Sequence, residues 1–285
     1  MIQEFKKFEF SRERGIVWVC DIANSSKYLN SNDSATSLEE FLPRLNWVGA
    51  IVVEAAGGRF IKWTGDGFLA WFKSPLHREI NEIISNIFEA VWQLTVLINV
   101  TQLGVNSGEM FKVRHGVTYE RDALVTKIKH SEDYSSLDLT GRAVILAFRL
   151  SGVDSKFPNV ITERELVEAY HQTNRQIINF KKLEVSEDKK SKYFKNEEFG
   201  LDKLYTSTRK ADNVETIENV VNKGKKALNQ AENPSHSKFY NQFVENLSAG
   251  PSWCTSVLDE YTRFVEQDLK GTLEEVVEML EKKID

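Results

Sequence analysis

The stretch RFIKWTGDGFLAWF, residues 59–72, constrains the fold of this chain most, because it predicts two short β-strands joined by a tight turn over residues 64–67. Asp-Gly between apolar runs is a strong hairpin signal, since both residues tolerate the positive φ angles that a tight turn needs. Asp66 therefore lies at the tip of an otherwise apolar hairpin. Taken alone, Asp66 is only a turn residue, so any further role depends on the rest of the chain.

Composition limits the class of protein. A chain of 285 residues with 41% hydrophobic residues can form one large domain, or one domain with an appendage. Its net charge of −5 gives no basic footprint for nucleic acid. Cys20 and Cys254 are the only cysteines, which excludes a disulfide framework and fits a reducing cytosol. No apolar run approaches the ~20 residues that cross a bilayer, so we expect a soluble, cytoplasmic protein.

Hydrophobic patterns alternate between the strand and helix types along the first two thirds of the chain. Residues 15–22 form a continuous apolar run typical of a central strand, and residues 37–58 follow as a helix with a capping box at Ser37 and Glu40 and a stop at two glycines. Further elements are expected over 79–100 (helix), 111–119 (strand), 141–150 (helix), 158–170 (strand, then helix) and 177–207 (strands). From about residue 210 the chain is charged and helical in character. We predict an α+β domain over 12–207 and a helical C-terminal extension over 210–285.

Two aspartates are placed to act together. Asp21 ends the first strand, and Asp66 sits at the tip of a hairpin that should pair beside it. Two carboxylates on rigid elements suit a pair of divalent metal ions, which need oxygen ligands and open positions for substrate phosphates. Asn24, Ser25 and Ser26 follow, offering backbone N–H groups and hydroxyls to a polyphosphate. The alternative is that Asp21 is a helix N-cap and the serines are turn residues.

Four ordered motifs resemble the catalytic domain of class III nucleotidyl cyclases over about residues 12–207. They are VWVCDIANSSKYL (17–29), GGRFIKWTGDGFLAWF (57–72), KVRHGVTYERDAL (112–124) and LDLTGRAVILAFRL (137–150). The resemblance implies a ferredoxin-like βαββαβ core with a mixed, mainly antiparallel sheet, and a head-to-tail homodimer with active sites at the interface. It also implies that Asp21, Asp66 and the carbonyl of Ile22 hold two Mn²⁺ or Mg²⁺ ions.

The same resemblance implies a reaction in which a nucleoside triphosphate becomes a 3′,5′-cyclic monophosphate and pyrophosphate. Arg149 occupies the family position for a guanidinium that stabilises the transition state. Where the family has an asparagine that helps hold the ribose, this chain has Ile145. Either the protein is a degenerate, nucleotide-sensing relative, or another residue has replaced that asparagine. We favour Arg142, which lies on the same helix face, because both metal aspartates are retained.

Further residues are predicted to contact the γ-phosphate and the base of the substrate. For the γ-phosphate we choose Lys195, with Lys192 as the second choice and a plain loop lysine as the alternative. Lys62 and Asp138 stand at the two family positions that read the base edge, where such a pair resembles an adenylate cyclase.

The chain as a whole resembles the bacterial Pycsar anti-phage cyclases, which make cyclic UMP or cyclic CMP. An aromatic side chain, Trp63 or Tyr119, could narrow the pocket to a pyrimidine, the alternative being ordinary core packing. We place UTP first, CTP second and ATP third, with the product read by a separate cyclic-nucleotide-binding effector.

Two other classes of protein are alternatives. One pairs two carboxylates on a similar sheet, and the other keeps the cyclase fold without its activity. A GGDEF-type dinucleotide cyclase or a polymerase palm would pair two acids, but the chain has only TGDGF at the corresponding turn. A catalytically inactive homologue would bind nucleotide without turning it over.

Overall fold

The computed structural model describes residues 8–26, 32–74, 80–101, 112–130, 135–153, 159–174, 176, 178–184 and 203–208. These residues divide into two compact units, which are treated separately: the described parts of 1–23, 49–91 and 112–208 form one, and those of 24–48 and 92–111 the other. The predicted helical extension over 210–285, Lys192 and Lys195 lie outside the described residues.

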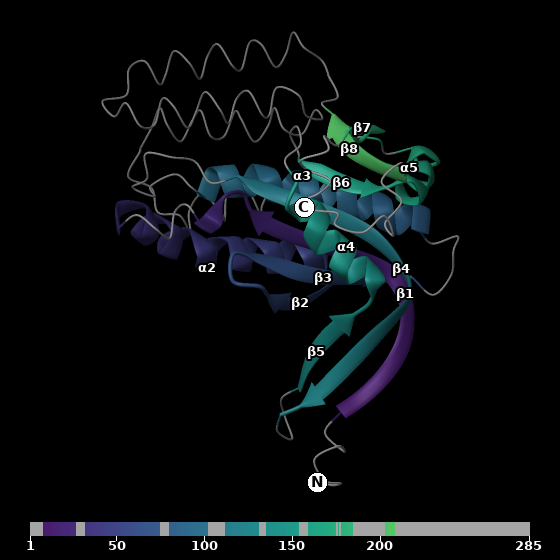
Figure 1. Cartoon of the computed structure of the whole chain (residues 1–285), viewed down its shortest axis with the longest axis horizontal. Helices are drawn as coiled ribbons and strands as arrows, with labels where there is room; N and C mark the ends of the chain where they lie inside the picture. The colour runs from purple at the N-terminus through teal and green to yellow at the C-terminus, as the bar shows by residue number, and fades with distance from the viewer. Residues whose placement is uncertain are drawn as a thin grey trace. The chain divides into compact units, whose positions relative to one another are not determined.

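The first unit is built on one mixed sheet (Figure 1). Its strands are β1 (Phe8–Ile22), β2 (Arg59–Trp63), β3 (Gly67–Lys73), β4 (Val113–Lys129), β5 (Ser135–Thr140), β6 (Val160–Glu163), β7 (Asn179–Lys182) and β8 (Leu204–Thr208). The helices of the chain are α2 (Asn32–Ala55), α3 (Ile80–Thr101), α4 (Arg142–Ser151) and α5 (Arg164–His171). The strand order is β2-β3-β1-β4-β6-β8-β7, with β5 paired to β4.

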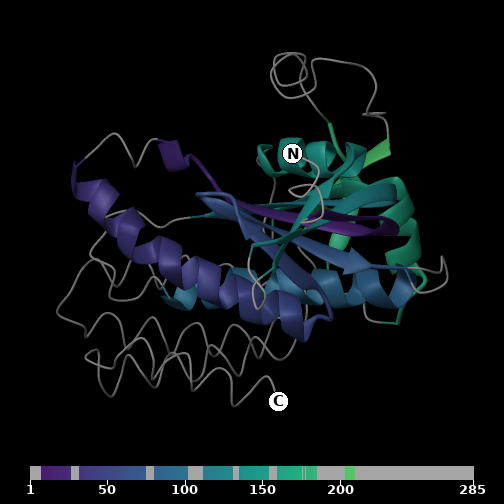
Figure 2. The ribbon, with the colours of Figure 1, turned by 90° about the horizontal axis from the view of Figure 1, so that it is seen from below.

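The pairing confirms the predicted fold class. From β1 to β4 the elements follow the order βαββαβ. The β4–β6 pair is parallel, and the other pairs in the described part of the sheet are antiparallel. Figure 2 shows α4 on one face of this sheet, with the end of α2 and the start of α3 on the other.

The centre of the sheet is the C-terminal half of β1. Residues 16–20 are fully buried because both faces of this strand are covered. On one face Val17 and Val19 share a core cluster with Ala147 of α4. On the other face the ring of Trp18 packs edge-on against Phe68 at 5.3 Å. A strand covered on both sides explains why the sequence here is a continuous apolar run and not an alternation.

The hairpin predicted at residues 59–72 is confirmed. Gly65 has φ +100°, which its lack of a side chain permits, and the N–H of Thr64 donates to the Gly67 carbonyl at 2.8 Å. The N–H of Ile22 donates to the Asp66 carbonyl at 2.9 Å. The tip of the hairpin is therefore fastened to the end of β1.

Helix α2 differs from its prediction at its start. It begins at Asn32, so the expected N-cap at Ser37 was wrong. Residues 32–34 are Asn, Asp and Ser, which cap helices as well as Ser37 does, and extending a helix costs less than nucleating one. The predicted stop is confirmed, since Gly57 has φ +82° and the Gly58 N–H bonds to the Val53 carbonyl at 2.9 Å.

An arm leaves the sheet, and the sequence did not predict it. Strand β4 continues to Lys129, well past the expected end at 119, and pairs there with β5 and with the first half of β1 (Figure 1). Phe8 and Phe10 are exposed on this arm, with Phe10 63% exposed. None of the helices in the described parts of the chain is long and apolar enough to cross a membrane.

Candidate active site

The first predicted metal ligand lies opposite an arginine. Asp21 ends β1 and is paired in register with Arg114 of β4, so both side chains point to the α4 face of the sheet. Arg114 Nη2 donates to Asp21 Oδ2 at 2.9 Å, and its Nη1 donates to the carbonyl of Gly152 at 3.1 Å. Sequence analysis missed Arg114, because only the register of β1 against β4 shows that it faces Asp21.

Asp21 is a perturbed carboxyl. Burial, and after it the charge of Asp66, raise the pKa of Asp21 from 3.8 to about 6, although the Arg114 guanidinium opposes them. Asp66 is half-buried at the hairpin tip. A buried carboxyl with a second acid beside it is stabilised as the anion by a bound cation, so this pair fits a divalent metal.

A metal held here would take few ligands from the protein. Groups of three or more His, Cys, Asp or Glu side chains suited to a metal are absent from the described ranges. Asp21 and Asp66 are the available carboxylates, and a ligand role for the Ile22 carbonyl stays a prediction. A site with two carboxylates leaves coordination positions for substrate oxygens, as phosphate-transfer sites require.

The residues predicted to read the base lie together. Lys62 Nζ, from β2, lies 2.6 Å from Asp138 Oδ1, from β5. The same oxygen accepts the N–H of Leu139 at 2.9 Å. Burial opposes ionisation of Asp138, but the hydrogen bonds from Lys62 and Leu139 outweigh it and lower the pKa of that carboxyl. Both side chains remain more than two-fifths exposed, so a ligand can reach the pair.

Helix α4 carries two residues predicted to act on the substrate, Arg142 and Arg149, and Ile145 at the position where the family has an asparagine. Arg142 begins the helix and is exposed, Ile145 is 53% exposed, and Arg149 lies half-buried in the last turn. Arg142 also lines a cavity of about 440 Å³ that includes Glu163 at the start of α5. Burial raises the pKa of Glu163, and the Tyr119 N–H that donates to its carboxylate, followed by the charge of Arg142, opposes this. The proposed replacement of the family asparagine by Arg142 stays a prediction.

The remaining predicted contacts are three residues of the second unit and two aromatic residues of the first. Asn24 has φ +61° and is exposed, Ser25 is half-buried and Ser26 is exposed. Their part in substrate binding stays a prediction. Trp63 ends β2 half-buried and is paired with Phe68, so its side chain points to the opposite face from that of Lys62. Tyr119 lines the same cavity as Arg142. Neither aromatic is a fully buried core residue.

Comparison with known proteins identifies the fold. No model of a protein family matches the sequence, and no curated protein matches it. Among solved structures, the adenylyl cyclase CyaB from P. aeruginosa has a TM-score of 0.51 at 16% identity, over 70% of this chain and 96% of that one. The catalytic core of a rhodopsin-guanylyl cyclase with converted specificity has a TM-score of 0.49 at 16% identity, over 71% and 98%. The chain has the fold of class III adenylyl and guanylyl cyclase domains.

Proposed function

We propose that this protein is a nucleotide cyclase that converts a nucleoside triphosphate to a 3′,5′-cyclic monophosphate and pyrophosphate. The observation that carries the proposal is the position of Asp21 and Asp66 at adjoining ends of β1 and the β2–β3 hairpin, joined by the Ile22–Asp66 backbone bond. The raised pKa of Asp21 supports a site that a cation would complete.

The chemistry needs positioning and charge neutralisation. The ribose 3′-hydroxyl gives its proton to water and its oxygen attacks the α-phosphorus in line. The new O3′–P bond forms as the bond from the α-phosphorus to the bridging oxygen of the β-phosphate breaks, and pyrophosphate leaves. Two Mn²⁺ or Mg²⁺ ions, held by Asp21, Asp66 and the Ile22 carbonyl, would supply the charge that acidifies the hydroxyl and grips the phosphates. Arg114 donates to Asp21 Oδ2 and would leave Asp21 Oδ1 for these ions. Arg149 is assigned to the charge that grows on the α-phosphate.

The active unit in this proposal is a head-to-tail homodimer. Asp21 and Asp66 act from one chain, while Lys62, Asp138 and Arg149 act from its partner. The exposed apolar residues support an interface, since Ile145 and Phe148 lie on α4 and Phe8 and Phe10 on the arm.

Base selection rests on the Lys62–Asp138 pair. Asp138 Oδ1 is already used by Lys62 and Leu139, so Oδ2 is the atom available to accept from a base. Uracil offers a carbonyl acceptor beside a ring N–H donor, whereas cytosine and adenine offer a ring nitrogen acceptor beside an amino donor. Each of the three bases can therefore accept from the Lys62 ammonium and donate to the Asp138 carboxylate. Trp63 follows Lys62 in β2 and is paired with Phe68, so its side chain points to the other face of the sheet, and the preference for a pyrimidine rests on the resemblance alone. We place UTP first, CTP second and ATP third, with cyclic UMP serving as an anti-phage messenger read by a separate effector.

The decisive experiment incubates the purified chain with each of the four nucleoside triphosphates and Mn²⁺. Product mass and pyrophosphate release are measured, with Asp66→Ala as the control. We expect cyclic UMP from UTP, and no product from the control. Turnover of another nucleotide would correct the base, and no turnover of any would favour the inactive, nucleotide-binding homologue, to which the apolar Ile145 also points.

A further inference from the structure

Helix α4 is held against β4 by side chains that alternate along the strand. At the C-terminal end of the helix, Arg114 donates to the Gly152 carbonyl at 3.1 Å. Near the N-terminal end, Thr118 Oγ1 donates to the Ala143 carbonyl at 2.8 Å. Gly116, between them, leaves room for the helix backbone to lie directly on the strand, since a Cβ there would collide with the Ala147 carbonyl. The strand therefore fixes the helix at both ends.

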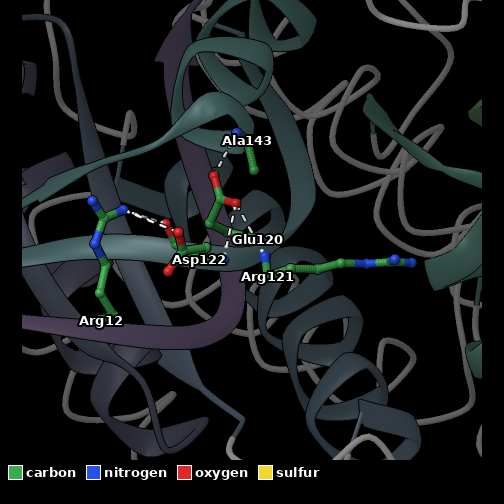
Figure 3. A network of polar contacts seen from close by, with 5 residues as sticks. All are labelled: Arg12, Glu120, Arg121, Asp122 and Ala143. Atoms are coloured by element: carbon green, nitrogen blue, oxygen red, sulfur yellow. Dashed lines mark hydrogen bonds and ion pairs between the residues drawn. The ribbon is translucent and has the colours of Figure 1, made fainter.

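Glu120 completes this arrangement at the start of the helix (Figure 3). Its side chain is only 9% exposed, and Oε2 accepts the N–H of Ala143 at 2.9 Å. Oε1 accepts the N–H groups of Arg121 at 3.0 Å and Asp122 at 3.3 Å, where the β1–β4 pairing is interrupted by a bulge. One carboxylate thus joins the bulge of β4 to the first turn of α4, and Ala143 is held through both its N–H and its carbonyl.

Glu120 takes the place of an N-cap side chain. The N-cap residue of α4 is Gly141, which has no side chain to accept a first-turn N–H. A Cβ at Gly141 would lie 3.0 Å from the Glu120 carboxyl carbon and closer still to its oxygen. The space in which a capping side chain would stand is therefore occupied by Glu120.

We propose that Glu120 is a positioning residue for the cyclisation, which sets the rotation and tilt of α4 and so the place of Arg149. The inference rests on the proposed function. Arg149 lies six residues beyond Ala143, about 9 Å along the axis at 1.5 Å per residue. A helix of 10 residues has little stability of its own, so its orientation depends on the contacts that hold it. Loss of the contact at Ala143 would leave the first turn free to rotate.

The first test replaces Glu120 by alanine in the full chain. We expect kcat for the nucleotide that the wild type uses to fall by roughly 10- to 100-fold, with KM within about threefold, because the variant misplaces a group that acts in the transition state. Amide hydrogen exchange at residues 142–146 should become at least about tenfold faster. The matched control is Asp122→Asn, which changes the neighbouring acid. The Asp122 carboxylate lies 3.1 Å from the exposed Arg12, so we expect kcat and hydrogen exchange to stay within about twofold of wild type.

A second variant moves the cap into the helix. Gly141 has an extended backbone that serine can adopt, and Ser Oγ at an N-cap accepts a first-turn N–H. Gly141→Ser alone should lower activity, because its Cβ meets the Glu120 carboxylate. In Glu120→Ala/Gly141→Ser that obstacle is gone, and we expect kcat and exchange protection to return to within about threefold of wild type, a strong coupling between the two sites.

The outcomes separate the proposal from a purely structural role. Wild-type kcat in folded Glu120→Ala would overturn it, as would a double variant that regains protection at residues 142–146 without regaining kcat. If Glu120→Ala alone does not fold, the double variant decides, because it must regain kcat together with exchange protection at residues 142–146. If the wild type turns over none of the four nucleotides, the proposed function fails, whereas the hold of Glu120 on α4 is still tested by hydrogen exchange.

Discussion

Arg114 Nη2 of β4 lies 2.9 Å from Asp21 Oδ2 of the neighbouring strand β1, on the face of the sheet that α4 covers. Both side chains are mostly buried, so the pair is screened little by solvent. Through Nη1, the same guanidinium binds the Gly152 carbonyl at the end of α4. The carboxylate of Asp21 and the helix that carries Arg149 are thus connected by one side chain.

The raised pKa of Asp21 predicts how metal-free stability depends on pH. The folded state holds this proton up to about pH 6, whereas the unfolded chain releases it near 3.8. The unfolding free energy should therefore fall by up to about 3 kcal/mol as pH rises between these values. Above pH 6 the titration of Asp21 should change the unfolding free energy no further. Asp21→Asn, which keeps an acceptor for Arg114, should remove this part of the pH dependence. Urea denaturation of both proteins from pH 4 to 7 measures it, and parallel curves would contradict the assignment.

Metal binding should show the opposite pH dependence, because a ligand carboxylate must lose its proton. At pH 7.5 we expect Mn²⁺ to raise the melting temperature, and at pH 5, where Asp21 is mostly protonated, the increase should be lost. Asp21→Asn, which keeps an acceptor for the buried Arg114, and Asp66→Ala should each abolish both the increase and cyclisation while the chain stays folded. A Mn²⁺ effect that persists in both variants would place the metal elsewhere.

The sequence predicted the parts of this site that rest on apolar patterning. The apolar run at residues 15–22 placed Asp21 at the end of a strand, and the pattern at residues 59–72 placed Asp66 in the turn of a hairpin. Lys62 and Asp138 were found by resemblance, and the structure places them 2.6 Å apart although they are separated by 76 residues.

Arg114 and Glu120 were not found, for a physical reason. Each acts through its register against a neighbouring element, and register depends on pairing that a single strand does not encode. Strand β5 and the long end of β4 were missed because charged and apolar residues mix there, as expected of an arm that stands away from the core. The capping signal at Ser37 failed for a related reason, since several polar residues upstream could serve equally well.

The dimer proposal predicts complementation. Asp66→Ala and Arg149→Ala should each be inactive as homodimers, because every site then lacks one essential group. Mixed and allowed to exchange subunits, they should regain activity, since one of the two sites in a heterodimer keeps both groups. Recovery to roughly a quarter of the wild-type rate is expected for random exchange. Subunit exchange is verified by native mass spectrometry, and no recovery despite verified exchange would indicate sites built within one chain.

The last prediction concerns the position where the family has asparagine. If Arg142 has taken over that role, Arg142→Ala should lower kcat by ~10²-fold or more, the usual cost of losing one transition-state donor, with a smaller effect on nucleotide binding. The matched control is Arg164→Ala, because Arg164 lines the same cavity as Arg142 and pairs with Glu168 at 2.7 Å. We expect its kcat to change by less than about twofold.

Ile145→Asn gives the complementary measurement. Because Ile145 is 53% exposed, the new amide can meet water, and the unfolding free energy should change by less than about 0.5 kcal/mol. A loss of ~1–3 kcal/mol would instead mean that the side chain is buried, in a dimer for example, and the amide left without a partner. Arg142→Ala with wild-type kcat would defeat the replacement, and recovery of activity in Arg142→Ala/Ile145→Asn would show that the two residues serve the same contact to the ribose.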